Sequence, residues 1–172
     1  LDKFLKLNKN LKKIWMYSTG LGLRKVLSEH GFSLGIKRRI AFLDLTMSID
    51  ELWKNMDKKR RNGIRYAIKN GVAIHTAKLG DLEAFKKVWV GGYKKKHGVK
   101  RKYDIRSWIE KEQLFLAKLG NKIIAGTRIR ESVYRPPRDV VIYGANTSLR
   151  EYQKFKPNDL LIWEIAKWAK KE

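Results

Sequence analysis

The pattern of apolar and polar positions predicts alternating helices and strands along most of the chain. Residues 23–30 can form a short helix with Val26 and Leu27 inward, which Gly31 would stop. Residues 40–45 are apolar apart from a single Asp and predict a buried strand. A capped helical pattern follows this strand.

That pattern starts at Ser48 and Glu51, which match a capping box, where each side chain satisfies a backbone N–H at the helix start. An apolar stripe at multiples of four follows, broken by the basic Arg60: Leu52, Met56, Ile64 and Ile68. We expect Asn62-Gly63 to loosen or kink this helix in the middle and Asn70-Gly71 to end it.

The second half of the sequence adds short strands and amphipathic helices. The predicted strands are residues 72–76, 113–119, 122–133 and 139–143. Gly120-Asn121 suits a two-residue hairpin turn between the second and third of them. Helices are expected after the cap Asp81, over 105–110 and after Pro157. This order predicts an α+β (α/β sandwich) domain with a mixed, mostly antiparallel sheet flanked by helices.

Composition limits the chemistry that the chain can perform. Its 172 residues suit one domain, or one domain with a remnant of another. Without Cys there are no disulfides and no thiolate chemistry, and three scattered His have no metal-ligand spacing, so we expect neither a metal nor a cofactor. No apolar run is long enough for a transmembrane segment and the start has no signal-peptide pattern, so a cytoplasmic location is expected.

The charge balance is strongly basic, with 40 Lys and Arg against 17 Asp and Glu and a net charge of +23. Such a field concentrates anions near the surface. The partners compatible with it are RNA, a phosphate-rich nucleotide substrate and the acidic inner leaflet as a peripheral membrane contact. A Lys-rich surface that only interacts with solvent explains the same composition, and charge alone leaves both readings open.

Two ordered sets of segments resemble a known family. The first runs from the predicted strand through the capped helix to the basic stretch Lys59-Arg60-Arg61-Asn62-Gly63-Ile64-Arg65-Tyr66-Ala67 and Asn70-Gly71-Val72. The second consists of Ile123-Ile124-Ala125-Gly126, Tyr143-Gly144-Ala145 and Pro157-Asn158-Asp159-Leu160-Leu161-Ile162-Trp163-Glu164. Over about residues 40–172 their order is similar to FemAB-like proteins, the peptidoglycan interpeptide bridge aminoacyltransferases with a GNAT-related fold.

The resemblance implies two GNAT-like subdomains, of which the chain looks like a fragment. Residues 1–45 would be the tail of a preceding subdomain, and 46–172 a GNAT-like acyltransferase domain without its last strands. In the family another strand and a Phe-Lys motif, whose Lys is linked to catalysis, follow the helix around Trp168. Lys154-Phe155-Lys156 lies before that helix and is not equated with the motif. No residue of the chain is therefore assigned as catalytic.

The resemblance also implies the reaction, the transfer of an amino acid from aminoacyl-tRNA to the peptide amine of a peptidoglycan precursor. A tRNA ester is already activated, so positioning of the two substrates can supply most of the catalysis. Two alternatives remain: an N-acyltransferase that uses acyl-CoA or acyl carrier protein, and a non-catalytic RNA-binding module. The sequence lacks the GNAT pyrophosphate loop Gln/Arg-x-x-Gly-x-Gly/Ala, which weakens the acyl-CoA alternative.

Basic residues on the predicted helix are the first candidates for substrate binding. Lys58, Arg61, Arg65 and Lys69 are spaced by three or four and would share one helical face. With the lysines and arginines of the basic loop 94–102 they could bind tRNA phosphates or a nucleotide diphosphate. A solvated basic face is the alternative reading.

A second set of candidates follows the last predicted strand, where substrate sites commonly lie. These candidates are Tyr143, Asn146 and Arg150, and loop residues that satisfy their own turn are the alternative reading. Asn158 is interpreted first as a helix cap. His75 and His97 are interpreted as structural or exposed, and four tryptophans as core residues: Trp53, Trp89, Trp163 and Trp168.

Overall fold

A computed structural model describes residues 21–33, 41–94, 103–131 and 140–171. The chain divides into two compact units, Leu1–Phe42 and Leu43–Glu172. In the first unit, helix α2 (Leu21–Glu29) is followed by Gly31 at φ +79°. The predicted helix and its glycine stop are confirmed, but Val26 is 44% exposed and does not point inward.

The second unit contains a four-stranded antiparallel sheet in the order β1-β2-β3-β4. The strands are β1 (Val72–Thr76), β2 (Leu114–Leu119), β3 (Lys122–Glu131) and β4 (Val141–Ser148). The helices are α3 (Ile49–Asn55), α4 (Lys58–Lys69), α5 (Leu82–Trp89), α7 (Ile105–Glu110) and α8 (Pro157–Lys171). Shorter helical turns are η1 (Leu79–Asp81), η2 (Val90–Lys94) and η3 (Arg150–Phe155).

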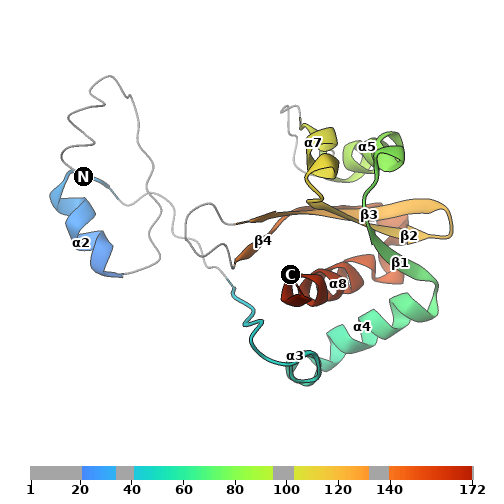
Figure 1. Ribbon diagram of the computed structural model, residues 1–172, viewed down its shortest axis with the longest axis horizontal. Helices are drawn as coiled ribbons and strands as arrows, with labels where there is room; N and C mark the ends of the chain where they lie inside the picture. The colour runs from blue at the N-terminus through green and yellow to red at the C-terminus, as the bar shows by residue number, and fades with distance from the viewer. Residues whose placement is uncertain (1–20, 34–40, 95–102, 132–139, 172) are drawn as a thin grey trace. The chain divides into compact units, whose positions relative to one another are not determined.

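Helices cover both faces of the sheet, so the predicted α+β class with a mostly antiparallel sheet is confirmed (Figure 1). On one face α3, α4 and α8 enclose an apolar cluster that includes Ile64, Phe115 and Leu161. On the other face α5 and α7 enclose a second cluster around Phe85 and Trp108. Because successive strand residues point to opposite faces, β2, β3 and β4 contribute to both clusters, whereas β1 contributes to the first.

The four tryptophans assigned to the core are core residues, as predicted. Trp89 and Trp163 are 5% and 8% exposed. Trp53 and Trp168 are partly buried and pack against the apolar cluster that α3, α4 and α8 enclose. The Trp53 and Trp163 ring centroids lie 5.1 Å apart, at a tilt that aromatic pairs favour. These rings fix how α3 sits against α8.

The predicted strand at 40–45 is wrong over the residues that the structure describes. Residues 41–44 are irregular and exposed, with Phe42 at 77% exposure. Asp44 instead accepts hydrogen bonds from the backbone and hydroxyl of Thr46, which makes a turn. A strand needs a neighbouring strand for its backbone groups, and among the described residues none pairs with this segment.

The predicted helix that runs through Asn62-Gly63 is in fact two helices. The capping box at Ser48 and Glu51 is present, but α3 ends at Asn55 and α4 begins after Asp57, whose carboxylate accepts from the Lys59 N–H. Gly63 lies within a continuous α4, which Asn70-Gly71 ends as predicted, with Gly71 at φ +77°. Ile68, assigned to the apolar stripe, is 56% exposed.

The hairpin between β2 and β3 is confirmed, with Gly120 at φ +56°. β4 extends to Ser148, five residues beyond its predicted end at Tyr143. Positions 132, 133 and 139 of the predicted strands lie outside the described residues, as do 95–102 of the basic loop. α5 begins after Asp81, but the Asp81 side chain does not cap it.

Candidate functional site

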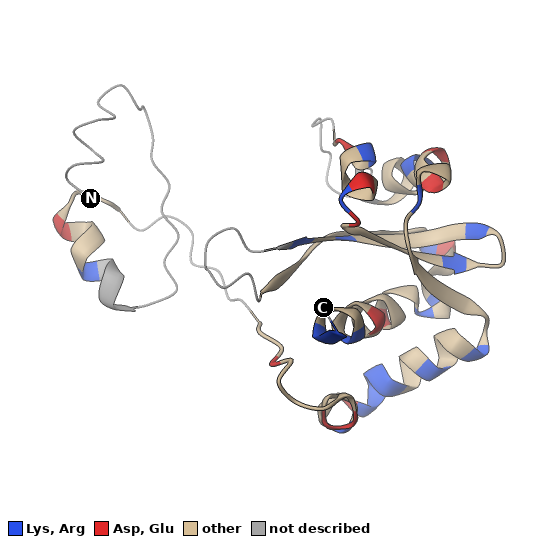
Figure 2. Ribbon diagram, in the orientation of Figure 1, with Lys and Arg blue, Asp and Glu red and all other residues tan. Residues whose placement is uncertain are grey.

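The basic helix α4 begins with four cations, Lys58 to Arg61, and Figure 2 shows this concentration of Lys and Arg in its first turns. Arg61 turns back to α3, where its Nη1 donates to the carbonyls of Trp53, Lys54 and Met56, at 2.8 Å for Lys54. Carbonyls at a helix end lack intrahelical partners, and a cation stabilises them. Arg61 therefore holds the α3–α4 junction.

Arg65 and Lys58 are more accessible. The Arg65 guanidinium lies 5.2 Å from the Trp53 ring centroid, and its Nη1 is 3.5 Å from the Asn62 side-chain oxygen. Both Arg65 and Lys58 are exposed, whereas Arg61 is half-buried. Of the three predicted anion ligands on α4, Arg65 and Lys58 can meet a ligand without breaking backbone contacts.

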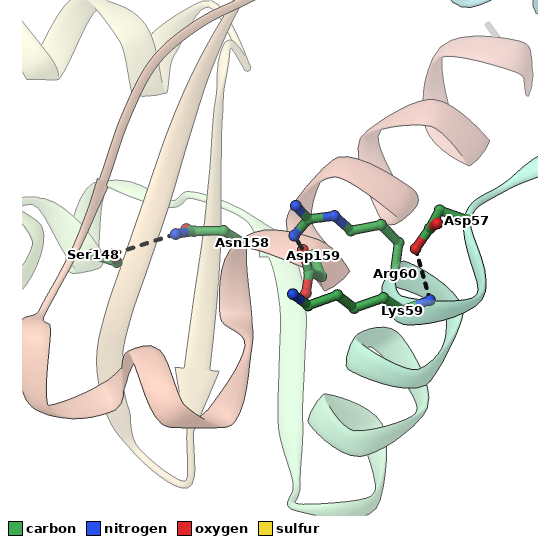
Figure 3. Close-up of polar contacts among 6 residues, drawn as sticks. All are labelled: Asp57, Lys59, Arg60, Ser148, Asn158 and Asp159. Carbon is green, nitrogen blue, oxygen red and sulfur yellow. Dashed lines mark hydrogen bonds and ion pairs between the residues drawn. The ribbon is translucent and has the colours of Figure 1, made fainter.

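Arg60 points to the other side of α4, toward the start of α8 (Figure 3). Its Nη1 lies 2.9 Å from Asp159 Oδ1, and the Asp159 side chain is only 14% exposed. Gly63 is buried beside the same carboxylate, with which any Cβ at position 63 would collide. The role of Gly63 is thus close approach between two helices, and the predicted kink is wrong.

A set of polar side chains fills the space between β3, β4 and the start of α8; we call it the β4 polar cluster. Its members are Thr127, Tyr143, Asn146, Ser148 and Asn158. The Asn146 Nδ2 lies 2.7 Å from Thr127 Oγ1, 2.9 Å from the Tyr143 hydroxyl and 3.2 Å from Asn158 Oδ1. An amide nitrogen has only two N–H groups, so these three oxygens share them.

The hydroxyl of Tyr143 contacts Thr127 and Asn146, although the residue is 40% exposed. Burial raises the pKa of Tyr143, against hydrogen bonds to Thr127 and Asn146 that lower it. The phenol is therefore neutral at neutral pH and acts as both donor and acceptor. The β4 polar cluster contains no carboxylate, His or Lys, so its neutral groups suit amides and hydroxyls better than ionic groups.

The start of α8 connects this cluster to the basic helix. Asn158 donates from Nδ2 to Ser148 Oγ at 3.4 Å, while the next residue, Asp159, pairs with Arg60 on α4 (Figure 3). Asn158 is not the helix cap that the sequence predicted, because both ends of its amide face β4. Two adjacent residues of α8 thus connect the two parts, since Asn158 contacts β4 and Asp159 contacts α4.

The six predicted binding residues separate into three groups. Arg61 and Arg65 lie at the α3–α4 junction, and Tyr143 and Asn146 lie in the β4 polar cluster. Lys58 is exposed at the start of α4, and Arg150 is exposed at the start of η3. Arg150 does not enter the cluster; from η3 it is Gln153 that donates to Ser148 Oγ, at 3.2 Å.

Sequence reasoning missed Thr127 and Asp159. Thr127 is fully buried, and a polar residue directly after Ile123-Ile124-Ala125-Gly126 was the signal that could have revealed it. Asp159 carried no such signal, because an acidic residue in the first turn of a helix is common. Only the helix packing places it beside Arg60 and Gly63.

A separate ionisable group consists of His75, Asp81 and Lys118. Asp81 accepts from Lys118 Nζ at 2.9 Å and lies 3.3 Å from His75 Nε2. Burial, together with the nearby charge of Lys118, lowers the pKa of His75 despite the opposing effect of Asp81. The structural interpretation of His75 fits these contacts; His97 lies outside the described residues.

Within the described ranges, no group of three or more His, Cys, Asp or Glu side chains is arranged to hold a metal ion. No helix in the same ranges is both long and apolar enough to cross a bilayer.

The fold has relatives among solved structures. A crystal structure of FemX superposes with a TM-score of 0.58 at 14% identity, over 74% of this chain and 48% of FemX. The C-terminal domain of a putative lysylphosphatidylglycerol synthetase from Agrobacterium fabrum superposes with a TM-score of 0.51 at 10% identity, over 66% of this chain and 37% of that chain. The mixed α+β architecture is therefore that of a GNAT-related fold.

The family model that matches is that of the FemAB family, over residues 26–105. The resemblance read from the sequence is thus confirmed, and the chain is FemAB-like. The chain spans about half the length of FemX, at 48%. A comparison with curated proteins gives no match.

Proposed function

We propose that the chain is part of an aminoacyltransferase that moves an amino acid from aminoacyl-tRNA to the peptide amine of a peptidoglycan precursor. The match to the FemAB family model over residues 26–105 is the observation that carries the proposal. The FemX-like fold supports it, because the segments that first suggested the family form one continuous unit.

In this proposal the two parts of the site bind different chemistry. Lys58 and Arg65 are exposed cations that attract the anionic part of a substrate, either tRNA phosphate or the diphosphate of a nucleotide-linked precursor. The β4 polar cluster offers neutral donors and acceptors, which suit the amide groups of the precursor peptide. Arg150, exposed on η3, is the third cation proposed to meet substrate.

The role of these residues is to orient the substrates. An ester on tRNA is activated before it reaches the protein, so holding the amine at the ester carbon supplies much of the rate. The cluster has no group that would take up a proton at neutral pH, since Tyr143 is its only ionisable member and its pKa is raised. As the amine forms an amide bond to the aminoacyl carbon, the ester bond to the tRNA ribose breaks, and the proton that the amine loses balances the hydroxyl regained by the tRNA.

The test is a transfer assay on the full-length gene product with labelled aminoacyl-tRNA and a nucleotide-linked cell-wall pentapeptide. Label in the peptide is the expected result. Arg65→Ala should raise KM for the precursor or the tRNA about tenfold, as for loss of one charge-assisted contact. Lys86→Ala, an exposed cation paired with Glu83 on α5, is the matched control and should leave transfer unchanged.

The second structural neighbour suggests an additional acceptor for the same assay. Its name, lysylphosphatidylglycerol synthetase, describes a lysyl group joined to a lipid. Phosphatidylglycerol vesicles are therefore included as an alternative acceptor, and acetyl-CoA as an alternative donor. Label that passes only to lipid, or only from acetyl-CoA, contradicts the proposal, and tRNA binding without any transfer would leave the RNA-binding module in its place.

A further inference from the structure

Arg128 lies on the opposite face of the sheet from the β4 polar cluster. It follows Thr127 in β3, so its side chain points to the face that α5 and α7 cover (Figure 1). Its guanidinium lies 4.8 Å from the centroid of the Trp108 ring, and Trp108 on α7 is only 4% exposed. A buried ring of this kind holds the guanidinium plane in one orientation.

The hydrogen-bonding capacity of Arg128 is mostly unused. A guanidinium has five N–H donors, and the contact found here is a long one, 3.4 Å from Nη2 to the Gln113 side-chain oxygen. Its Nε is buried and has no hydrogen-bond partner. Burial, with a contribution from Arg130, lowers the pKa of Arg128. A half-buried cation without an anionic partner is unfavourable unless an anion approaches it.

Three other arginines in the described ranges have partners of a kind that Arg128 lacks. Arg60 pairs with Asp159, Arg106 pairs with Glu110, and Arg61 binds backbone carbonyls. No carboxylate within those ranges pairs with Arg128 or with Arg130. Arg128 and Arg130 are two residues apart on one strand, so they point to the same face.

The backbone at this position is irregular. The pairing of β3 with β4 shifts register between Thr127 and Ile129, where Arg128 lies opposite two residues of β4, Gly144 and Ala145. Gly144 of β4 passes close to it, and a Cβ there would lie 2.7 Å from the Arg128 carbonyl oxygen. Bulges redirect a side chain and are enriched beside binding sites.

We propose that Arg128 and Arg130 bind a phosphate group on the α7 side of the sheet. The planar fork of a guanidinium matches phosphate oxygens, and a dianion balances two unpaired arginines where a single carboxylate would not. Trp108 holds Arg128 in place before the ligand arrives, which reduces the entropy lost on binding. The site does not depend on the transferase activity proposed above.

The test is a titration of the full-length protein with inorganic phosphate at constant ionic strength, followed by the arginine Nε–H signals in ¹H–¹⁵N spectra. The Arg128 signal should shift with saturation. Arg130→Gln, at an exposed position, and Arg128→Met should each weaken binding about tenfold. If Arg128→Met does not fold, Arg128→Lys takes its place. It keeps the charge without the planar guanidinium and should bind phosphate more weakly than the parent protein. Arg106→Gln on α7 is the control, since Glu110 already neutralises Arg106.

A static Arg128 signal, or equal binding by Arg130→Gln and the parent protein, would overturn the proposal. So would acetate that binds as tightly as phosphate, because the site would then be a general anion attractor. A nucleoside monophosphate and a short RNA then distinguish the source of the group. If only the monophosphate matches inorganic phosphate, the ligand is a terminal phosphate, and tighter binding of RNA assigns a polynucleotide backbone.

Discussion

Single residues in this chain have roles that depend on one neighbour, and Gly63 is the clearest example. Its substitution by Ala places a methyl group against the Asp159 carboxylate, so α4 and α8 must separate or Asp159 must leave Arg60. We expect Gly63→Ala to lower the free energy of unfolding by about 1–3 kcal/mol, as overpacking does. Denaturant unfolding of the variant and the parent protein measures this change in free energy. Gly80→Ala, at a glycine with open space around it, is the control and should be near neutral.

A double-mutant cycle tests whether the loss of stability comes from the collision with Asp159. In an Asp159→Ala background the collision is gone, so Gly63→Ala should have little effect there. An equal loss of stability in both backgrounds would mean that Gly63 acts through its backbone and not through its close approach to Asp159.

His75 offers a second prediction at this scale, on pH. Because its folded pKa is lowered from 6.5, the unfolded chain binds more protons near that pH, and this residue's contribution to stability is lost as pH falls below 6.5. NMR titration should place the His75 pKa below 6.5. Asp81→Asn removes the group that raises it and should lower the pKa further, while Lys118→Gln should raise it. A raised His75 pKa in Asp81→Asn, or a lowered one in Lys118→Gln, would refute the assigned contacts.

At the scale of elements, the α3–α4 junction rests on Arg61. Its Nη1 donates to three carbonyls at the end of α3, and a truncated side chain leaves those carbonyls without this cation. We expect Arg61→Ala to lower the free energy of unfolding by about 1–2 kcal/mol, as for loss of helix-end hydrogen bonds. Denaturant midpoints measure the change. Arg65→Ala is the comparison and should lose less, since its stacking on Trp53 is exposed.

The same junction shows what could be predicted from the sequence. Local sequence was sufficient where a residue determines the conformation of its own turn. Examples are the capping box at Ser48, the helix stop at Gly71 and the hairpin at Gly120. The break between α3 and α4 was missed because an apolar spacing of four continues across it. The segment 41–45 was misread because an apolar run predicts burial, and burial as a strand depends on a partner that local sequence does not specify.

The candidate site shows the same limit. Tyr143 and Asn146 were identified from their place at a strand end, and they do contact one another. Their partners Thr127 and Asn158 come from β3 and α8, so only the sheet register and helix packing bring them in. Arg61 was chosen by residue type and spacing, but its guanidinium faces α3, a direction that spacing alone does not fix.

For the whole molecule, the net charge of +23 is the property that charge-driven binding would use. If tRNA binds through phosphate contacts, its affinity should fall steeply with salt, because each neutralised phosphate releases counterions. Replacing one contacting cation should then reduce the slope of log affinity against log salt by about 1. We expect this for Arg65→Gln and Lys58→Gln, both exposed on α4, and not for Lys167→Gln, whose ammonium is paired with Glu164 on α8. Filter binding at several salt concentrations measures the slopes. Equal slopes in all three variants would assign the binding to the overall field of the protein and remove α4 from the tRNA surface.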